Sequence, residues 1–212
     1  MPLPTLWIVA GPNGAGKTTC TQRRPISQLL PGVRFLNPDD LSREKLVRQG
    51  LAGFADAPDD VRRTAFQESA DDVFHELTRA ITAGEAVGVE TVLSTDKYRT
   101  SVEAVRQSGG FVGLIYVALS SPELACQRVA ARVRHGGHDV PSDKVVARWE
   151  RSLDHLAWFA NSATAFWVFD NSNSDPNFPP LLSASGQFGK LNFLAEDIFP
   201  RLRSAVITIG ST

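Results

Sequence analysis

The sequence has little cysteine and no excess of either charge. Its 212 residues include only two cysteines, Cys20 and Cys126, and 22 Lys and Arg balance 23 Asp and Glu. The cysteines lie far apart, without the paired spacing of a zinc site or the density of a disulfide scaffold, which indicates a reducing compartment. Because the formal net charge is −1, no overall positive field attracts nucleic acid or an anionic membrane, and we expect neither as a partner.

Long apolar runs, internal repeats and low-complexity tracts are also lacking. The apolar run at residues 5–10 is too short for a signal-peptide core or a membrane span, and no basic residue precedes it. We therefore expect a cytoplasmic protein. The hydrophobic content of 42% is enough for one core, so residues 1–212 are predicted to form a single domain.

Short apolar runs alternate with segments of helical periodicity. Strands are predicted at residues 6–10, 33–36, 86–91, 111–119 and 165–171. Helices are predicted from residue 17 to near 25 and at 41–48, 61–83, 101–108, 122–134 and 142–159. This alternation predicts an α/β fold with a five-stranded, mostly parallel sheet and helices on both faces. The chain after Pro180 is compatible with a short edge strand pair and a terminal helix.

One motif stands between the first strand and the helix that follows it. Residues 11–18, GPNGAGKT, match G-x-x-x-x-G-K-[ST] at every fixed position, and we call them the P-loop. Glycines let successive backbone N–H groups face phosphates, Lys17 reaches the outer phosphates, and the Thr18 hydroxyl completes a magnesium shell. The alternative is a glycine-rich turn with an accidental lysine.

The P-loop predicts a P-loop NTPase or kinase fold with ATP and Mg²⁺ as cofactors, and GTP remains open. Thr18 is the predicted metal ligand. The residues assigned to the nucleotide are Gly11, Pro12, Asn13, Gly14, Ala15, Gly16, Lys17, Thr18 and Thr19.

Acidic side chains follow two of the predicted strands. Asp39 and Asp40 come after the second strand, and Glu90 and Thr91 end the third. Because parallel strands bring their carboxyl ends to one edge, we expect these residues near phosphates bound at the first strand. A carboxylate there can take the proton from an attacking hydroxyl, a role worth ~10²–10⁴ in rate. Helix capping by an aspartate and a solvated strand end for Glu90 are the alternatives.

A basic, glycine-hinged segment follows the fourth strand. It spans about residues 128–148, and we call it the basic segment. Arg128 and Arg132 lie one helical turn apart within it. Such a segment can close over a nucleotide as a lid, exclude water and bring arginines to the transferring phosphate. A solvated helix face is the alternative. His135 and His138 have no third convergent ligand, so we do not expect them to bind metal.

Five blocks of the sequence, taken in order, resemble the zeta toxin family. They are residues 10–19, 37–39, 90–94, 132–141 and 170–172. Their spacing is similar to that of a compact bacterial branch, and the resemblance covers about residues 5–172. It implies a kinase that uses ATP to phosphorylate a sugar hydroxyl of UDP-N-acetylglucosamine. Toxicity and a cognate antitoxin are expectations from the family alone.

The resemblance also implies roles for single residues. Asp39 matches the catalytic base of the family, and Glu90 matches the acid that helps to hold the sugar, with Asp40 and Thr91 as further candidates for substrate contact. Lys17 matches the phosphate-binding lysine, and Thr18 matches the magnesium ligand.

Arginines of the lid act on the phosphates in the zeta toxin family, which indicates Arg128 and Arg132 here. Two positions depart from the pattern. Asn37 stands where the classical toxins of the family carry an acid two positions before the base, and His138 falls near one of their lid arginines.

The residues leave other functions open. A P-loop kinase could instead phosphorylate a hydroxyl of an antibiotic, a nucleoside or another metabolite, because one fold serves many acceptors. An alternative of another functional class is a nucleotide-dependent binding protein or switch ATPase, whose hydrolysis would drive an interaction with a partner. A polynucleotide kinase is disfavoured by the near-neutral charge and the lack of a basic stripe.

Overall fold

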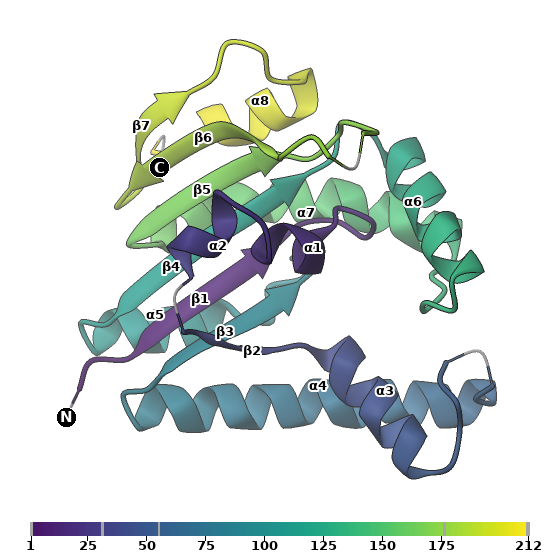
Figure 1. Ribbon diagram of the computed structural model, residues 1–212. Helices are drawn as coiled ribbons and strands as arrows, with labels where there is room; N and C mark the ends of the chain where they lie inside the picture. Colours follow the sequence, from purple (N-terminus) through teal and green to yellow (C-terminus); the bar gives the residue numbers. More distant parts are fainter. Residues whose placement is uncertain (1, 31, 55, 176, 211–212) are drawn as a thin grey trace.

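The computed structural model describes residues 2–30, 32–54, 56–175 and 177–210, and a sheet runs through its centre (Figure 1). The strands are β1 (Thr5–Ala10), β2 (Arg34–Leu36), β3 (Ala86–Thr91), β4 (Phe111–Ala118), β5 (Ala165–Asp170), β6 (Leu181–Gln187) and β7 (Lys190–Leu194). Their order is β2-β3-β1-β4-β5-β6-β7. Pairing is parallel from β2 to β5 and antiparallel from β5 to β7.

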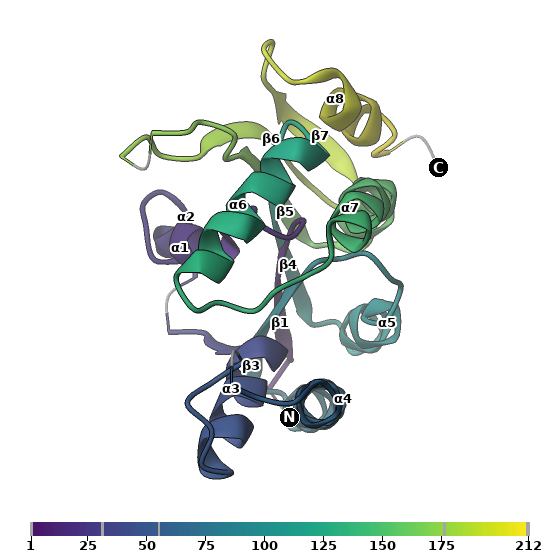
Figure 2. The same cartoon turned by 90° about the vertical axis from the view of Figure 1, so that its right-hand side faces the viewer.

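Helices cover both faces of this sheet. They are α1 (Lys17–Thr21), α2 (Ile26–Leu29), α3 (Pro38–Arg48), α4 (Asp59–Thr82), α5 (Arg99–Gln107), α6 (Pro122–Arg134), α7 (Ser142–Ser162) and α8 (Pro200–Ile207). Figure 2 shows α4, α5, α7 and α8 along one face, with α1 and α2 on the other. None of these helices combines the length and the apolar character needed to cross a bilayer.

The prediction of five strands was wrong, because the sheet has seven. The two additional strands form the antiparallel edge. The sequence of β6, LLSASGQ, is rich in Ser and contains Gly186, and such residues give a weak strand signal. The β6–β7 turn uses Phe188 and Gly189, both at positive φ (49° and 71°), instead of the Asn-Gly or Asp-Gly pair that marks such turns.

The central strands β1 and β4 are buried on both faces, which explains their continuous apolar sequences. Every residue from Leu6 to Ala10 is buried, and fully buried side chains such as Ile8 contribute ~1.5–3 kcal/mol each. Trp7 stacks on Trp167 with ring centroids 5.9 Å apart. A Cβ at Gly113 would lie 2.4 Å from the Trp7 ring, so only glycine fits there. This rigid centre leads directly into the P-loop.

A second, smaller cluster of buried side chains lies apart from the main core. It consists of Leu46, Phe54, Ala57 and Ala65, and we call it the α3–α4 cluster. The two helices that carry it pack against each other, and the buried Ser42 hydroxyl donates to the carbonyl of Pro38 at 2.6 Å. The packing fixes the start of α3, which follows the β2 strand end.

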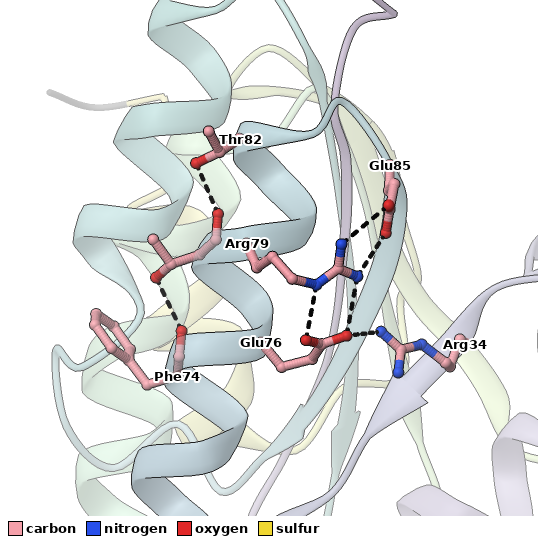
Figure 3. A network of polar contacts seen from close by, with 7 residues as sticks. Arg34, Phe74, Glu76, Arg79, Thr82 and Glu85 are labelled. Carbon is pink, nitrogen blue, oxygen red and sulfur yellow. Dashed lines mark hydrogen bonds and ion pairs between the residues drawn. The ribbon is translucent and has the colours of Figure 1, made fainter.

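An exposed ion-pair network ties α4 to the sheet at the end away from the P-loop (Figure 3). Arg79 donates to Glu76 at 2.9 and 3.0 Å and to Glu85 at 2.9 and 3.1 Å, and Arg34 of β2 pairs with Glu76 as well. Hydrogen bonds from Arg79 and then Arg34 lower the pKa of Glu76 to about 2. Because the groups are exposed, single pairs contribute little, and the network acts through its shared Glu76.

Candidate active site

A cavity of about 560 Å³ opens where β1, β2 and β3 end. Figure 1 shows that these strands point to the side of the sheet where α3 and α6 lie. Parallel sheets bind ligands at this edge. The cavity is lined by Asn13, Gly14, Gly16, Lys17, Thr18, Thr19, Asn37, Pro38, Asp39, Glu90, Thr91, Val92, Ser94, Tyr98, Arg128, Arg132 and Arg148.

The P-loop has a backbone shape that depends on its glycines. Gly14 and Gly16 have φ angles of 77° and 78°. A Cβ at Gly14 would lie 2.8 Å from the Ala125 carbonyl oxygen, and one at Gly16 would lie 2.9 Å from Asn171 Nδ2. Asn171, at the end of β5, donates to the Ala15 carbonyl at 2.8 Å. The loop is therefore held in one form, with its backbone available to phosphate oxygens.

Lys17 lies against the loop that precedes it. Its Nζ donates to the carbonyls of Gly11 at 2.9 Å and Pro12 at 3.2 Å. Burial lowers the pKa of Lys17, and the carboxylates of Glu90 and Asp39 act in the opposite direction. These two acids therefore lie close enough to the ammonium to stabilise its charge.

Three side chains connect the P-loop to the ends of β3 and β2. Thr18 Oγ1 donates to Glu90 Oε2 at 3.0 Å, and Asn37 Nδ2 donates to the same oxygen at 3.3 Å. Asn37 Oδ1 accepts from the Asp39 backbone N–H at 3.0 Å. Burial raises the pKa of Glu90, while the Lys17 charge and the Thr18 hydrogen bond lower it.

The two aspartates that follow β2 occupy different positions. Asn37, and neither aspartate, is the N-cap of α3. Asp39 lines the cavity with an exposed side chain. Asp40 is not among the residues that line the cavity in the described part of the chain, and burial, Asp39 and Glu44 raise its pKa. The structure brings Asp39, but not Asp40, to the cavity beside Lys17.

Three arginines reach the cavity from the basic segment. Arg132 lines it and donates to the His138 carbonyl at 2.8 Å. Arg128 lines it too, and its Nη2 donates to the Asn173 carbonyl at 2.8 Å in the loop after β5. Arg148 of α7 also lines the cavity; sequence analysis included it in the basic segment but chose Arg128 and Arg132 for the phosphates. Only the packing of α7 reveals its place at the cavity: the neighbouring Trp149 is buried and donates to the Leu119 carbonyl at 3.0 Å.

The loop between α6 and α7 crosses to the α3–α4 cluster. The His138 ring packs on Phe66 and Phe54, with centroid distances of 4.4 and 5.3 Å. Burial lowers the pKa of His138. His138 therefore docks the basic segment on the α3–α4 cluster. From the sequence, the comparison with the zeta toxin family only placed His138 near the position of a lid arginine.

The side of the cavity near the β3 end carries residues that the sequence analysis did not single out. Val92, Ser94 and Tyr98 line it. Tyr98 is buried, and burial raises its pKa to about 12, so the phenol stays neutral near pH 7. Thr91 shapes the turn, because its hydroxyl accepts from the backbone N–H of Leu93 at 3.1 Å. Val92 and Ser94 belong to the sequence block at residues 90–94, but no role was assigned to them, and no motif marks Tyr98, the N-cap of α5.

A second cavity, of about 260 Å³, adjoins the P-loop on its other side. Arg128, Gly14, Gly16 and Thr19 line both cavities. The remaining walls of the second cavity are Cys20, Arg23, Asn171, Asn173, Ser174, Asp175, Phe178 and Pro180. Its position beside the P-loop suits the nucleoside part of a nucleotide whose phosphates lie in the loop.

The chemistry of the donor set fits magnesium. Among the described residues, no group of three or more His, Cys, Asp or Glu could hold a metal ion. The Thr18 hydroxyl donates a hydrogen bond to Glu90, so the lone pairs of the hydroxyl oxygen stay available to a cation. Mg²⁺ is commonly bound by one or two protein oxygens together with substrate phosphates and water. The Thr18 hydroxyl, with Glu90 behind it, is compatible with such a partial site.

A family model described as an AAA domain matches residues 6–158. No curated protein matches the sequence significantly. Among solved structures, AvrRxo1-ORF1:-ORF2 with ATP has 17% identity and a TM-score of 0.68 over 98% of this chain and 64% of that one. AvrRxo1-ORF1:AvrRxo1-ORF2 with sulphate ions has 18% identity and a TM-score of 0.63 over 89% and 60%.

A chain of the PezAT chromosomal toxin-antitoxin system of Streptococcus pneumoniae is also similar, with 14% identity and a TM-score of 0.58 over 81% of this chain and 69% of that one. At such identities the likeness concerns the fold, and it confirms an α/β, P-loop kinase-like fold with a mostly parallel sheet. This chain spans less than two thirds of the length of the two AvrRxo1 chains described above.

Proposed function

The chain belongs to the family described as an AAA domain, and from its cavity we propose that it is an ATP-dependent kinase of a small-molecule hydroxyl. The proposed acceptor is a sugar hydroxyl of UDP-N-acetylglucosamine. One observation carries the proposal: Asp39, which does not cap α3, lines the same cavity as Lys17 and Thr18. A carboxylate thus lies beside the place where a triphosphate would end.

The donor side of the reaction follows from the P-loop. Its backbone N–H groups and Lys17 hold the outer phosphates and place the terminal phosphoryl group toward Asp39. Thr18 and Glu90 would hold Mg²⁺, which when bound neutralises charge on the phosphate oxygens. ATP is favoured as the nucleotide because a similar fold has been solved with ATP.

The acceptor side of the reaction follows from the other cavity walls. Asp39 takes the proton of the attacking hydroxyl as the oxygen bonds to the phosphorus, a contribution of ~10²–10⁴ in rate. Arg132 and Arg148 face the same space and stabilise charge on the transferred group. We propose that the basic segment acts as a lid, docked through His138, that excludes water from the reaction.

The nucleotide-sugar acceptor rests on the resemblance of the five sequence blocks and on the charge of the cavity. Its acceptor side includes Tyr98 and Ser94, which can bind hydroxyl groups, and the arginines that line the cavity give it a positive charge that suits an anionic acceptor. The similarity to a chain of a toxin-antitoxin system supports a cognate antitoxin as a protein partner.

An acceptor screen tests the proposal. The purified protein is incubated with Mg-ATP and separate acceptors, including UDP-N-acetylglucosamine, other nucleotide sugars, nucleosides and aminoglycosides. Mass spectrometry then detects one added phosphoryl group, with Lys17→Ala as the inactive control. Transfer to UDP-N-acetylglucosamine is the expected result, and transfer to a different hydroxyl would overturn the acceptor alone. Slow loss of ATP without any phosphorylated product would overturn the kinase and favour a switch ATPase.

A further inference from the structure

The side chain of Asn37 lies between the two acids of the cavity and contacts both of their segments. Its Nδ2 donates to Glu90 Oε2 at 3.3 Å, and its Oδ1 accepts from the Asp39 backbone N–H at 3.0 Å. We propose that Asn37 is a positioning residue, which couples the metal-side acid Glu90 to the base Asp39. This inference rests on the proposed kinase function.

The partners of Asn37 determine the orientation of its amide. A backbone N–H only donates, so the Asp39 N–H requires the oxygen end of the amide. The NH₂ end then faces Glu90, whose Oε2 accepts this hydrogen bond as well as the one from Thr18. Both contacts are satisfied in one orientation and neither in the flipped one. An amide is the side chain of this length that supplies a donor and an acceptor together.

The contact with Glu90 has a chemical consequence at Thr18. Glu90 Oε2 accepts from two donors, Thr18 Oγ1 and Asn37 Nδ2. The hydrogen bond from Asn37 holds the Glu90 carboxylate toward the P-loop. There the carboxylate accepts a hydrogen bond from the Thr18 hydroxyl, and the lone pairs of the Thr18 oxygen stay available to a cation. An aspartate at position 37 would remove the donor and place a second negative charge beside the half-buried Glu90.

The contact with Asp39 sets the start of α3. Asn37 is the N-cap, with extended backbone angles, and Pro38 occupies the first helical position. The direction of the Asp39 side chain therefore depends on a residue that is also bonded to the end of β3. Helix capping alone does not require asparagine, because serine and aspartate cap equally well.

Because serine and aspartate can replace asparagine as a helix cap, substitutions at position 37 test the proposal. Asn37→Ser and Asn37→Asp retain the cap, but serine is too short to reach Glu90 and aspartate has no donor. Asn37→Ala loses both contacts. Each variant is measured for thermal unfolding, for the Mg²⁺ concentration that half-saturates binding of a fluorescent ATP analogue, and for kcat and acceptor KM.

We expect the serine variant to unfold near the wild-type temperature, while in both the serine and the aspartate variant the half-saturating Mg²⁺ concentration rises and kcat falls by roughly 10-fold or more. The acceptor KM should stay within about 2-fold of the wild-type value, because Asn37 contacts Glu90 and the Asp39 backbone and not the acceptor-side residues Ser94 and Tyr98. In a Glu90→Gln background, Asn37→Ser should have little further effect, since the two residues act as one unit.

Wild-type Mg²⁺ dependence and kcat in Asn37→Ser would overturn the inference and leave Asn37 as a helix cap only. Full additivity with Glu90→Gln would overturn it too. If the wild-type protein phosphorylates no acceptor, the proposed function fails, but the Mg²⁺ dependence of analogue binding still decides the role of Asn37.

Discussion

Asn171 Nδ2 donates to the carbonyl oxygen of Ala15 at 2.8 Å, joining the end of β5 to the middle of the P-loop. The loop that follows β5 thus starts in direct contact with the P-loop. It continues as a wall of the second cavity through Asn173 and Phe178. Arg128 strengthens the connection by donating to the Asn173 carbonyl. The nucleoside part of ATP is therefore expected between α1, Arg128 and this loop.

Phe178 is the aromatic side chain of that wall, and replacing it should weaken ATP binding. Stacking of a base on an aromatic ring is worth ~1–3 kcal/mol, so Phe178→Ala should raise the KM for ATP by about 5- to 150-fold with kcat little changed. Steady-state kinetics at saturating acceptor measures both values. Phe188→Ala is the matched control, because Phe188 lies 72% exposed at the β6–β7 turn. Equal effects of the two variants would contradict a nucleoside site.

Arg148 should be needed for the chemical step, although no motif marks it. It lines the cavity from α7. Removing a charged donor aimed at the transferring group typically costs ~10²–10³ in kcat, and we expect this for Arg148→Ala. Arg134→Ala is the control, since Arg134 belongs to the basic segment but is absent from the described lining of the cavity. Single-turnover measurements separate the chemical step from product release.

The fold could be predicted where burial leaves a strong signal in the sequence. Strands β1 and β4 consist mainly of apolar residues because both of their faces are covered, and Gly84 and Gly109 mark the ends of α4 and α5. The β6–β7 pair was considered only as a possible edge and was left out of the five predicted strands, because both strands have weak propensity; β6 forms by pairing with β5, and β7 by pairing with β6. Tertiary contact, and not local sequence, determines that edge.

At the site, too, some residues could be placed from the sequence and others depend on tertiary packing. The P-loop and the acids after β2 and β3 could be placed from a motif and from the rule that parallel strands end at one edge. Asp39 and Asp40 could not be separated, because the predicted helix began at residue 41. It begins at Pro38, and consecutive helical residues point about 100° apart. Arg148 reaches the cavity from α7 and Tyr98 from the N-cap of α5, and no short sequence pattern shows that these two positions face the same space.

Glu76 should make the stability of the protein depend on acid pH. Its pKa is about 2 in the folded protein against 4.5 for the free group. A lowered pKa stabilises the fold above about pH 4.5, and this contribution is lost as the pH falls toward 2. Urea unfolding of Glu76→Gln should therefore show a deficit at neutral pH that shrinks on acidification. Glu103→Gln on α5 is the control, and a deficit independent of pH would contradict the network's role.

The two aspartates after β2 offer the sharpest test of the chemistry, since they are neighbours of equal charge. Asp39→Asn should lower kcat by ~10²–10⁴ while ATP still binds, because an amide cannot accept the proton of the attacking hydroxyl. Asp40→Asn should change kcat far less, because Asp40 is outside the described cavity lining. Isothermal titration with ATP, alongside turnover, separates binding from catalysis. Comparable losses in both variants would indicate a general charge effect, whereas full activity of Asp39→Asn would exclude Asp39 as the base.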